Sequence, residues 1–178
     1  MKLRQEDVEH IKPQLKNAAN RLVQASIMPA RVADFVPAKK RFFFTKKAQF
    51  VEISKAWRLG VFLISPDAEL YCVGETTRAV PPGYPGHVSN ERERRREYTK
   101  AAFQSGFPEG EVLFFNSPLV HLEAGAELPS SSALLLHDGV FKVRWNPDVT
   151  HETAVPFASY LEEQISLQIE RSQFNPKE

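Results

Sequence analysis

The feature that most constrains the fold is an almost continuous apolar run, Trp57–Ile64, which is followed at once by turn residues. A short run rich in aromatic and β-branched residues predicts a strand buried on both faces. The next residues, Ser65-Pro66-Asp67-Ala68, have turn chemistry because proline supplies the fixed φ of the second turn position. The chain should therefore return through Leu70–Thr76 as an antiparallel hairpin.

Further strand patterns occur on both sides of this hairpin. Short aromatic and β-branched runs predict strands at Arg41–Thr45 and Phe50–Ile53. Another strand is expected from about Glu111 to Leu122. These runs indicate that most of the central part of the chain enters a sheet.

A second hairpin is expected near the C-terminal end of the strand region. Asp138-Gly139 is a preferred two-residue turn, so Leu134–His137 and Val140–Trp145 should pair around it. In the second of these strands Trp145 shares the buried side with two other apolar residues, whereas Arg144 faces solvent. The alternation predicts one buried and one solvated face.

Helical periodicity marks the beginning and the middle of the chain. Apolar residues recur at steps of three and four over Val8–Leu22, where Pro13 either kinks the helix or begins a new one. Between Pro29 and Pro37 there is room for one short helical turn. A charged helix is expected from Asn90, which fits a capping box with the glutamate three residues later, to a glycine stop at Gly106.

A last helix is entered at Pro156, where Phe157, Leu161 and Ile165 form a stripe with a spacing of four. Helices at both ends and in the middle of a run of strands predict an α+β fold. In this fold, an antiparallel sheet of about five or six strands is covered by the N-terminal, middle and C-terminal helices.

Length and composition predict a single globular domain over residues 1–178. With 178 residues, 42% of them hydrophobic and 13 of them Phe, the chain can bury one core without disulfides or metals. The first residues are too polar for a signal peptide, and no run approaches the roughly 18 apolar residues that span a bilayer. Cys72 is the only cysteine, which excludes an internal disulfide. We therefore expect a cytoplasmic protein with no membrane contact.

The charges are unevenly distributed, although the net charge is +1. Through Arg58 the chain has 13 Lys and Arg against 5 Asp and Glu, and the remainder has 10 against 17. This split fits an anionic partner for the first part, or two regions that attract each other within one fold. The near balance of the whole chain favours the second interpretation.

The segment 76–96 is the most distinctive candidate site, because a Pro-Gly loop leads there into the charged helix. Free N–H groups and the dipole at a helix start favour a bound anion. We expect Arg78, Tyr84, His87 and Arg95 to contact a small anionic ligand. The alternative is a solvated helix face, on which glutamates and arginines pair at helical spacing.

The segment Lys39–Lys47 interleaves basic and aromatic residues, a combination that suits single-stranded nucleic acid. An edge strand whose lysines prevent unwanted pairing explains the same pattern. Because the total charge is nearly neutral, nucleic acid is not an expected partner. The aromatic strand and a one-sided sheet leave a face for a second copy, so we expect a homodimer.

Motifs of the well-marked enzyme classes are missing. The sequence contains no G-x-S-x-G elbow, Walker loop or G-x-G-x-x-G, and its five histidines have no metal-ligand spacing, so neither a metal nor a cofactor is expected. A Nudix metal site is excluded because Tyr98–Ser105 contains no acidic residue. Cys72 lies between apolar neighbours, so we interpret it as a small buried hydrophobic residue and not as a nucleophile.

Four segments of the chain form a distinctive set. They are Trp57–Val61, Gly74–His87, Arg96–Tyr98 and Gly106–Glu111. Together they resemble a family of small uncharacterised bacterial proteins, some of which are labelled glutaminase. That label implies amide hydrolysis. However, the Ser-x-x-Lys of serine-type glutaminases is absent, and Cys72 does not lie in the Gly-x-Cys-x-Gly elbow of the amidotransferase type.

Two classes of function therefore remain. The first is a cytoplasmic binding domain that takes a small anionic ligand or a protein partner through the 76–96 junction. The alternative is an amide hydrolase whose site is assembled from residues distant in sequence. The hydrolase requires a deep pocket in which a nucleophile or base meets an oriented partner, and a binding domain does not.

Overall fold

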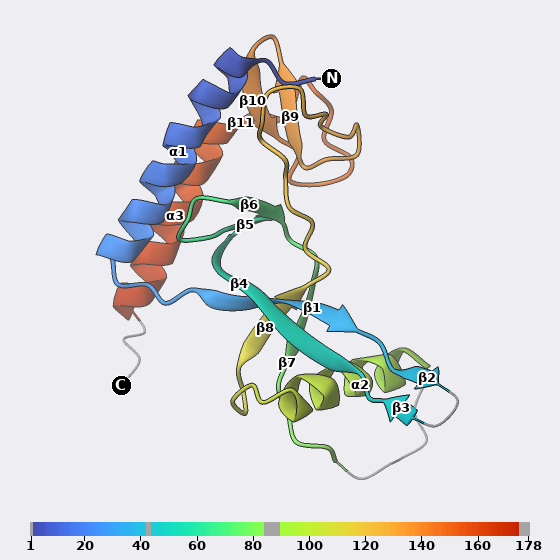
Figure 1. Ribbon diagram of the computed structural model, residues 1–178. Coiled ribbons are helices and arrows are strands. Elements are labelled where there is room, and N and C mark those ends of the chain that lie inside the picture. Colours follow the sequence, from blue (N-terminus) through green and yellow to red (C-terminus); the bar gives the residue numbers. More distant parts are fainter. Residues whose placement is uncertain (1, 42–43, 84–89, 175–178) are drawn as a thin grey trace. The chain divides into compact units, whose positions relative to one another are not determined.

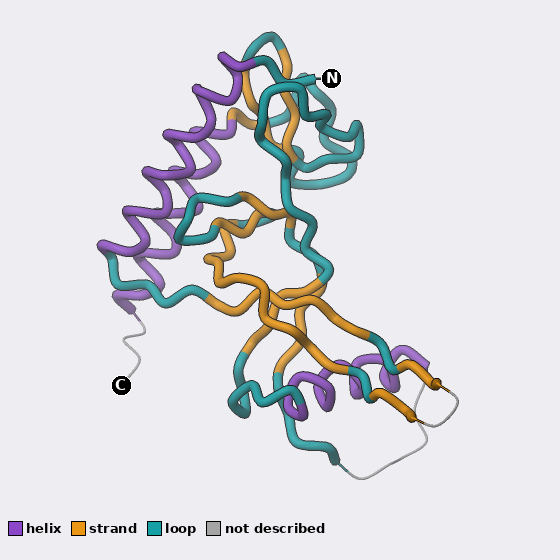
Figure 2. The backbone as a smooth tube through the Cα atoms, viewed as in Figure 1, coloured by secondary structure: helices purple, strands orange, loops and turns teal. Residues whose placement is uncertain are grey.

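The structure is a computed structural model that describes residues 2–41, 44–83 and 90–174 (Figure 1). Helices lie near both ends and in the middle of the described chain, and runs of strands lie between them (Figure 2). The helices are α1 (Gln5–Gln24), α2 (Asn90–Gln104) and α3 (Phe157–Phe174). The strands are β1 (Ala30–Val36), β2 (Lys39–Arg41), β3 (Phe44–Lys46), β4 (Gln49–Leu59), β5 (Phe62–Ile64), β6 (Leu70–Cys72), β7 (Glu75–Arg78), β8 (Val112–Phe115), β9 (Leu134–His137), β10 (Val140–Val143) and β11 (Val155–Pro156).

The fold is α+β, as the sequence predicts, but its main sheet is mixed. Six strands follow the order β6-β5-β4-β1-β8-β7, and β1 pairs parallel with β8, with Val32 opposite Phe114. The expected sheet of five or six strands is present, but it is mixed and not purely antiparallel. A parallel pair requires a long crossover, so it leaves no turn signal in the local sequence. The segment between Pro29 and Pro37 forms β1, where a helical turn was expected.

Contacts along the chain divide it into two compact units. Unit 1 consists of residues 1–29, 56–73 and 118–178, and unit 2 consists of residues 30–55 and 74–117. The strand β4 runs through the boundary, so both units use part of it. Buried apolar side chains in the described residues form two clusters, one in each unit, where a single core was expected. That residues 1–178 act as one domain stays a prediction.

The two long helices build much of the unit 1 core. α1 and α3 lie side by side (Figure 1) and bury the apolar stripes that the sequence predicts. α1 is a single helix with Pro13 inside, so no new helix begins there. At its start Asp7 accepts hydrogen bonds from the backbone N–H and the guanidinium of Arg4, at 2.8 and 3.0 Å. This contact satisfies a free N–H group at the helix entrance.

The apolar run Trp57–Ile64 is a hairpin and not one strand. β4 ends at Leu59, the chain turns at Gly60 with φ +62°, and β5 pairs back on β4 with Phe62 opposite Leu59. The N–H of Val61 donates to the Tyr160 hydroxyl of α3 at 2.9 Å. Because both strands are buried, the run of apolar residues hides the turn.

The two hairpins that the sequence predicts from their turns are confirmed. β5 and β6 pair antiparallel across residues 65–69, and the N–H of Ala68 donates to the Ser65 carbonyl at 2.9 Å. β9 and β10 pair across Asp138 and Gly139, whose φ values are +51° and +74°. The other half of the expected Leu70–Thr76 strand belongs to β7, which pairs with β8.

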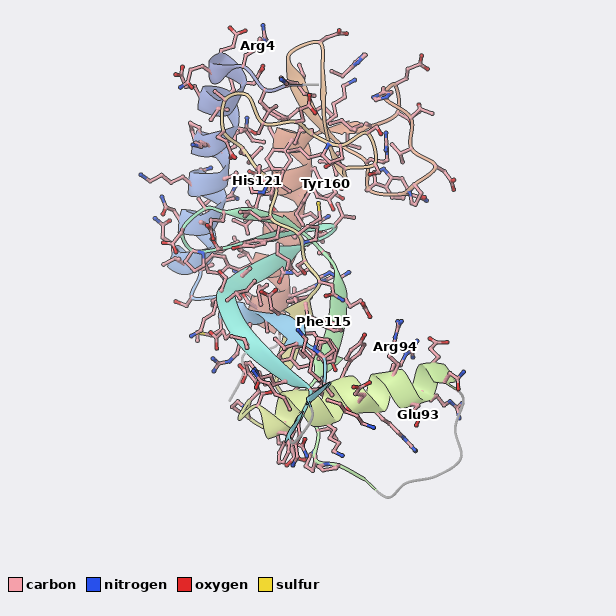
Figure 3. All side chains as sticks on the ribbon, turned by 45° about the vertical axis from the view of Figure 1, so that its right-hand side comes forward. Arg4, Glu93, Arg94, Phe115, His121 and Tyr160 are labelled. Carbon is pink, nitrogen blue, oxygen red and sulfur yellow. The ribbon has the colours of Figure 1, made fainter. Side chains whose placement is uncertain are left out.

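Unit 2 is organised by a cluster of aromatic rings under α2. Tyr98 of α2 lies 4.8 Å from the ring centroids of both Phe35 and Phe115, and Phe50 lies 5.1 Å from Phe115. Figure 3 labels Phe115 in this cluster. The Ser105 hydroxyl at the end of α2 accepts a hydrogen bond from the N–H of Phe50 at 2.8 Å. α2 is thus attached to the sheet by its C-terminal half.

Of the two strands expected at the margins of unit 2, one is shorter than predicted and the other lies partly outside the described residues. β8 covers only Val112–Phe115 of the expected Glu111–Leu122, because Asn116 takes a positive φ of 51° that ends the strand. The expected strand Arg41–Thr45 includes residues 42 and 43, which lie outside the described residues. On either side of them, β2 and β3 pair antiparallel, with Lys39 opposite Lys46.

Candidate functional site

The structure describes two of the four residues that the sequence predicts to form a ligand site. Arg78 of β7 and Arg95 of α2 line one hollow of about 520 Å³ within unit 2, which we call the β7–α2 hollow. Tyr84 and His87 lie outside the described residues. The structure therefore brings two of the four nominated residues to the same place.

Carboxylates pair with two of the arginines in the β7–α2 hollow. Nη2 of Arg95 lies 2.6 Å from Oε1 of Glu91, and Nη2 of Arg94 lies 3.5 Å from Oε2 of Glu75 on β7. Figure 3 shows Arg94 projecting from α2. Arg78 has no hydrogen-bond or ion-pair partner among the described residues. The pairs fit a solvated helix face, and they leave Arg78 available to an anion.

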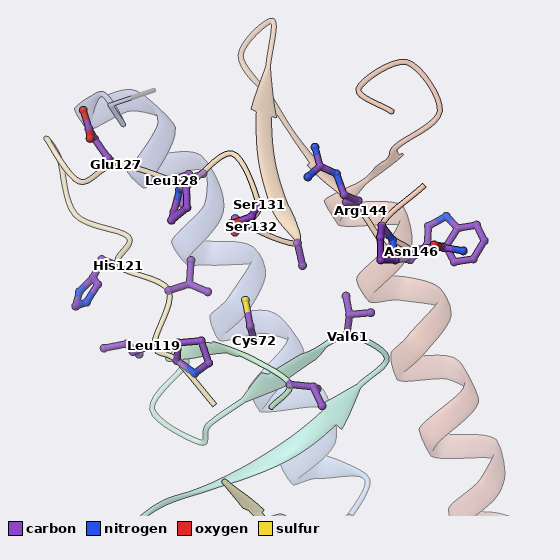
Figure 4. A pocket seen from close by; sticks show the side chains of 17 residues that line it. Val61, Cys72, Leu119, His121, Glu127, Leu128, Ser131, Ser132, Arg144 and Asn146 are labelled. Atoms are coloured by element: carbon purple, nitrogen blue, oxygen red, sulfur yellow. The ribbon is translucent and has the colours of Figure 1, made fainter. Parts of the chain in front are cut away.

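A larger pocket, of about 640 Å³, lies within unit 1 (Figure 4). One wall is the end of β6 with the segment 118–121 beside it, where the N–H of Cys72 donates to the Pro118 carbonyl at 3.0 Å. The opposite wall is the loop 127–133 with the segment that follows β10. These two are joined because the N–H of Arg144 donates to the Ala133 carbonyl at 2.7 Å. We call this site the unit 1 pocket.

Most side chains around the unit 1 pocket are apolar. Val61 and Leu119 lie towards the strands, and Leu128 and Trp145 come from the opposite segments. The polar lining residues are His121, Glu127, Ser131, Ser132, Arg144 and Asn146. A pocket of this size, with an apolar lining and a few polar groups, has the character of a small-molecule site.

Arg144 is the most unusual group in this pocket. Its Nη1 donates to the Ser130 carbonyl at 2.8 Å, whereas its Nε is buried and has no hydrogen-bond partner. In Figure 4 the guanidinium extends towards the loop that carries Ser131. No carboxylate among the described residues forms an ion pair with it. A buried donor without a partner is costly, but this Nε has almost no accessible surface, so a ligand in the pocket would meet the exposed part of the guanidinium and not this atom.

Cys72 places a neutral thiol in the unit 1 pocket. Its sulfur points into the pocket, towards Ser131 and Ser132 (Figure 4). Burial raises the pKa of this thiol above the usual 9.0, although a hydrogen bond with the Ala133 backbone opposes the shift. The residue is half-buried and not fully buried as expected. The raised pKa agrees with the interpretation that Cys72 is not an activated nucleophile.

No catalytic pair with Cys72 is present among the described residues. His121 also lines the pocket, but its Nδ1 lies 3.4 Å from Oε1 of Glu123, and no hydrogen bond joins it to Cys72. A cysteine nucleophile needs a base within hydrogen-bond reach.

The sequence could not reveal the unit 1 pocket, because its lining comes from segments far apart in the chain. Arg144 was expected to face solvent and Trp145 to be buried. In the structure β10 ends at Val143, so the alternation stops there; the Nε of Arg144 is buried and Trp145 is 53% exposed. The one local signal was a cysteine with apolar neighbours.

Within residues 2–41, 44–83 and 90–174, no group of three His, Cys, Asp or Glu side chains is arranged to hold a metal ion. Over the same residues, none of the helices has the length and apolar character needed to cross a bilayer. Comparison with known families, curated proteins and solved structures finds no match to this chain.

Proposed function

We propose that this protein binds a small molecule in the unit 1 pocket. The observation that supports the proposal is the mainly apolar pocket of about 640 Å³, in whose lining the guanidinium of Arg144 has no carboxylate partner among the described residues. Apolar surface provides affinity, and a single placed donor orients the ligand. The neutral thiol of Cys72 adds to the apolar lining.

The experiment is a ligand screen against the protein and two matched variants. A ligand that binds only the folded state raises the unfolding temperature. Leu119→Phe fills the unit 1 pocket from a side chain that is 40% exposed, and Val140→Phe makes the same kind of change outside the pocket at a side chain that is 47% exposed. Ligands should stabilise the parent and Val140→Phe, and lose their effect on Leu119→Phe. Equal stabilisation of all three proteins would place the site elsewhere.

A second candidate is the expected binding of a small anion at the β7–α2 hollow, and it is supported by Arg78, whose charge has no partner in the described residues. This proposal has its own test, the double variant Arg78→Ala with Arg95→Ala. If the folded double variant binds every ligand from the screen as tightly as the parent, no ligand uses this hollow.

The amide hydrolase remains the alternative from a different class, and it is supported by the family resemblance alone. It predicts release of ammonia from glutamine by the purified protein. A loss of this activity in Cys72→Ser would connect the reaction with the unit 1 pocket. Absence of ammonia release across neutral and alkaline pH would contradict this alternative.

A further inference from the structure

We infer that the two-stranded ribbon formed by β2 and β3 binds double-stranded DNA in the major groove, through lysines that contact phosphates on both sides of the groove. The binding does not depend on base sequence, because these lysines contact the charged backbone of the DNA. The inference concerns unit 2 alone and does not require a ligand in the unit 1 pocket.

The ribbon carries a local excess of positive charge. From residue 35 to residue 51 the chain has five Lys and Arg and no Asp or Glu. The nearly neutral total charge, which argues against a nucleic acid, averages this segment with acidic segments elsewhere. Within residues 2–41, 44–83 and 90–174, no ion pair or hydrogen bond is formed by the exposed side chains of Lys39, Lys40, Lys46 and Lys47. The charge of the ribbon is therefore available to an external anion.

Two like charges lie directly opposite each other in the ribbon. β2 and β3 form a sheet of their own (Figure 1), in which Lys39 lies opposite Lys46. Like charges in this position destabilise a sheet, because their Cβ atoms are only about 5 Å apart. Lysines that only prevent edge pairing do not need to face each other, so protection of the edge does not explain this arrangement. An anion bound between the two side chains would relieve the repulsion.

Both faces of the ribbon carry lysines. Side chains alternate between the two faces along a strand, so Lys40 lies on the face opposite to that of Lys39 and Lys46. The same alternation places Lys47, the residue after β3, on the face of Lys40. Glu97 of α2 lines a hollow together with Lys47, but among the residues that the structure describes the two do not form an ion pair. A partner that contacts one face alone would leave half of these charges unused.

Lysines on both faces favour a partner with a groove over a flat one. A ribbon is about 10 Å thick with its side chains, and the major groove of B-form DNA is about 12 Å wide and admits a two-stranded ribbon. Phosphates line both walls of this groove, so each face of the ribbon meets one wall. A membrane presents its charge in one plane. The major groove of double-stranded RNA is too narrow for side chains to enter. Double-stranded DNA is therefore the polyanion that fits best.

The test measures the binding of a fluorescein-labelled DNA duplex of about 20 base pairs by fluorescence anisotropy at several salt concentrations. The same DNA strand without its complement and an RNA duplex of equal length are measured in the same way. Binding to vesicles that contain phosphatidylserine is measured by co-sedimentation. These three probes represent the other polyanions that a basic surface attracts.

Two double variants remove the charges of one face each, and a third serves as the control. The first is Lys39→Gln with Lys46→Gln, and the second is Lys40→Gln with Lys47→Gln. The control is Lys12→Gln with Lys16→Gln, which changes two exposed lysines of α1 in unit 1. All three variants change the net charge by the same amount, and their unfolding temperatures show that they are folded.

The parent should bind the DNA duplex more tightly than the other three probes. Each phosphate contact contributes about −0.9 to the slope of log K against log salt, so four contacts lower the affinity about a hundredfold between about 50 and 200 mM salt. Each variant of the ribbon keeps two contacts, so it should bind more weakly at low salt and lose only about tenfold over the same range. The control should keep the hundredfold dependence.

Four outcomes would overturn the inference. Absence of duplex binding by the parent at low salt rejects DNA as the partner. If both ribbon variants bind as the control does, the DNA site is elsewhere. If only one ribbon variant weakens binding, the partner contacts a single face and the groove is rejected. Equal or tighter binding of the single strand, the RNA duplex or the vesicles replaces double-stranded DNA by that partner. None of these outcomes bears on the unit 1 pocket, so the proposed function is tested separately.

Discussion

Replacing Gly60 with alanine tests the packing of the turn between β4 and β5. A Cβ on Gly60 would overlap the hydroxyl of Tyr160 and lie 2.8 Å from its Cζ. The backbone there has a φ of +62°, which alanine adopts at a cost of about 1–2 kcal/mol. Moving Tyr160 also breaks its hydrogen bond with the N–H of Val61, which contributes about 1 kcal/mol. We therefore expect Gly60→Ala to lower the free energy of unfolding by about 2–4 kcal/mol.

The assay is urea unfolding followed by tryptophan fluorescence. Both tryptophans, Trp57 and Trp145, belong to unit 1, so the signal reports the unit that contains the mutation. The control is Gly125→Ala, because Gly125 has a φ of +89° but open space around the added Cβ. It should cost only the backbone term, about 1–2 kcal/mol.

A double-mutant cycle with Tyr160→Leu separates the backbone term from the steric term. With the tyrosine removed, Gly60→Ala should cost about as much as Gly125→Ala, which gives a coupling free energy of about 1–2 kcal/mol. If Gly60→Ala and Gly125→Ala are equally destabilising in the parent background, the contact with Tyr160 does not constrain the turn and the reasoning is refuted.

Three further predictions follow from contacts within each unit. Hydrogen bonds from Arg21 hold the pKa of Glu162 below its usual 4.5. The pair therefore stabilises unit 1 above pH 4.5, and this contribution is lost as the pH falls through the lowered pKa. The urea midpoints of the parent and of Glu162→Gln should converge at acid pH, and a difference that stays constant with pH would contradict this. Because burial raises the pKa of Cys72 above 9.0, alkylation by iodoacetamide should accelerate at a higher pH in the folded protein than in urea, and identical pH profiles would contradict the burial of this thiol. Ser105→Ala removes the acceptor for the N–H of Phe50 and should increase the hydrogen exchange of that amide in unit 2, whereas unchanged exchange would show that the hydroxyl is not its main protection.

The sequence predicted those turns and helices whose formation depends only on residues close together in the chain. Asp138 and Gly139 both take a positive φ, and only a few residue types tolerate that, so the turn was visible in the sequence. The stripe at Phe157, Leu161 and Ile165 was visible because helical spacing alone produces it. Gly60 was missed because apolar residues surround it on both sides, and the hydrophobic pattern gives no reason to break the strand.

The parts that failed depend on contacts between distant segments. The parallel pairing of β1 with β8 has no local signature. By contrast, Arg78 and Arg95 were predicted together because they come from segments that are close in sequence, and both line one hollow in the structure. Arg144 could not be found in this way, because its place in the pocket lining depends on where β10 ends and on the loop that carries Ser130.

The boundary inside β4 also bears on the order in which the chain acquires structure during synthesis. The polypeptide passes between the two units four times, and unit 2 is complete once residue 117 has been made, whereas unit 1 lacks α3 until residue 174. Because the chain is synthesised from its N-terminus, unit 2 can fold before α3 has been made, when the apolar face of α1 is still uncovered. Until then Ile11, Leu15 and Leu22 are exposed to other nascent chains, so truncation before α3 should produce aggregation and not a smaller folded protein.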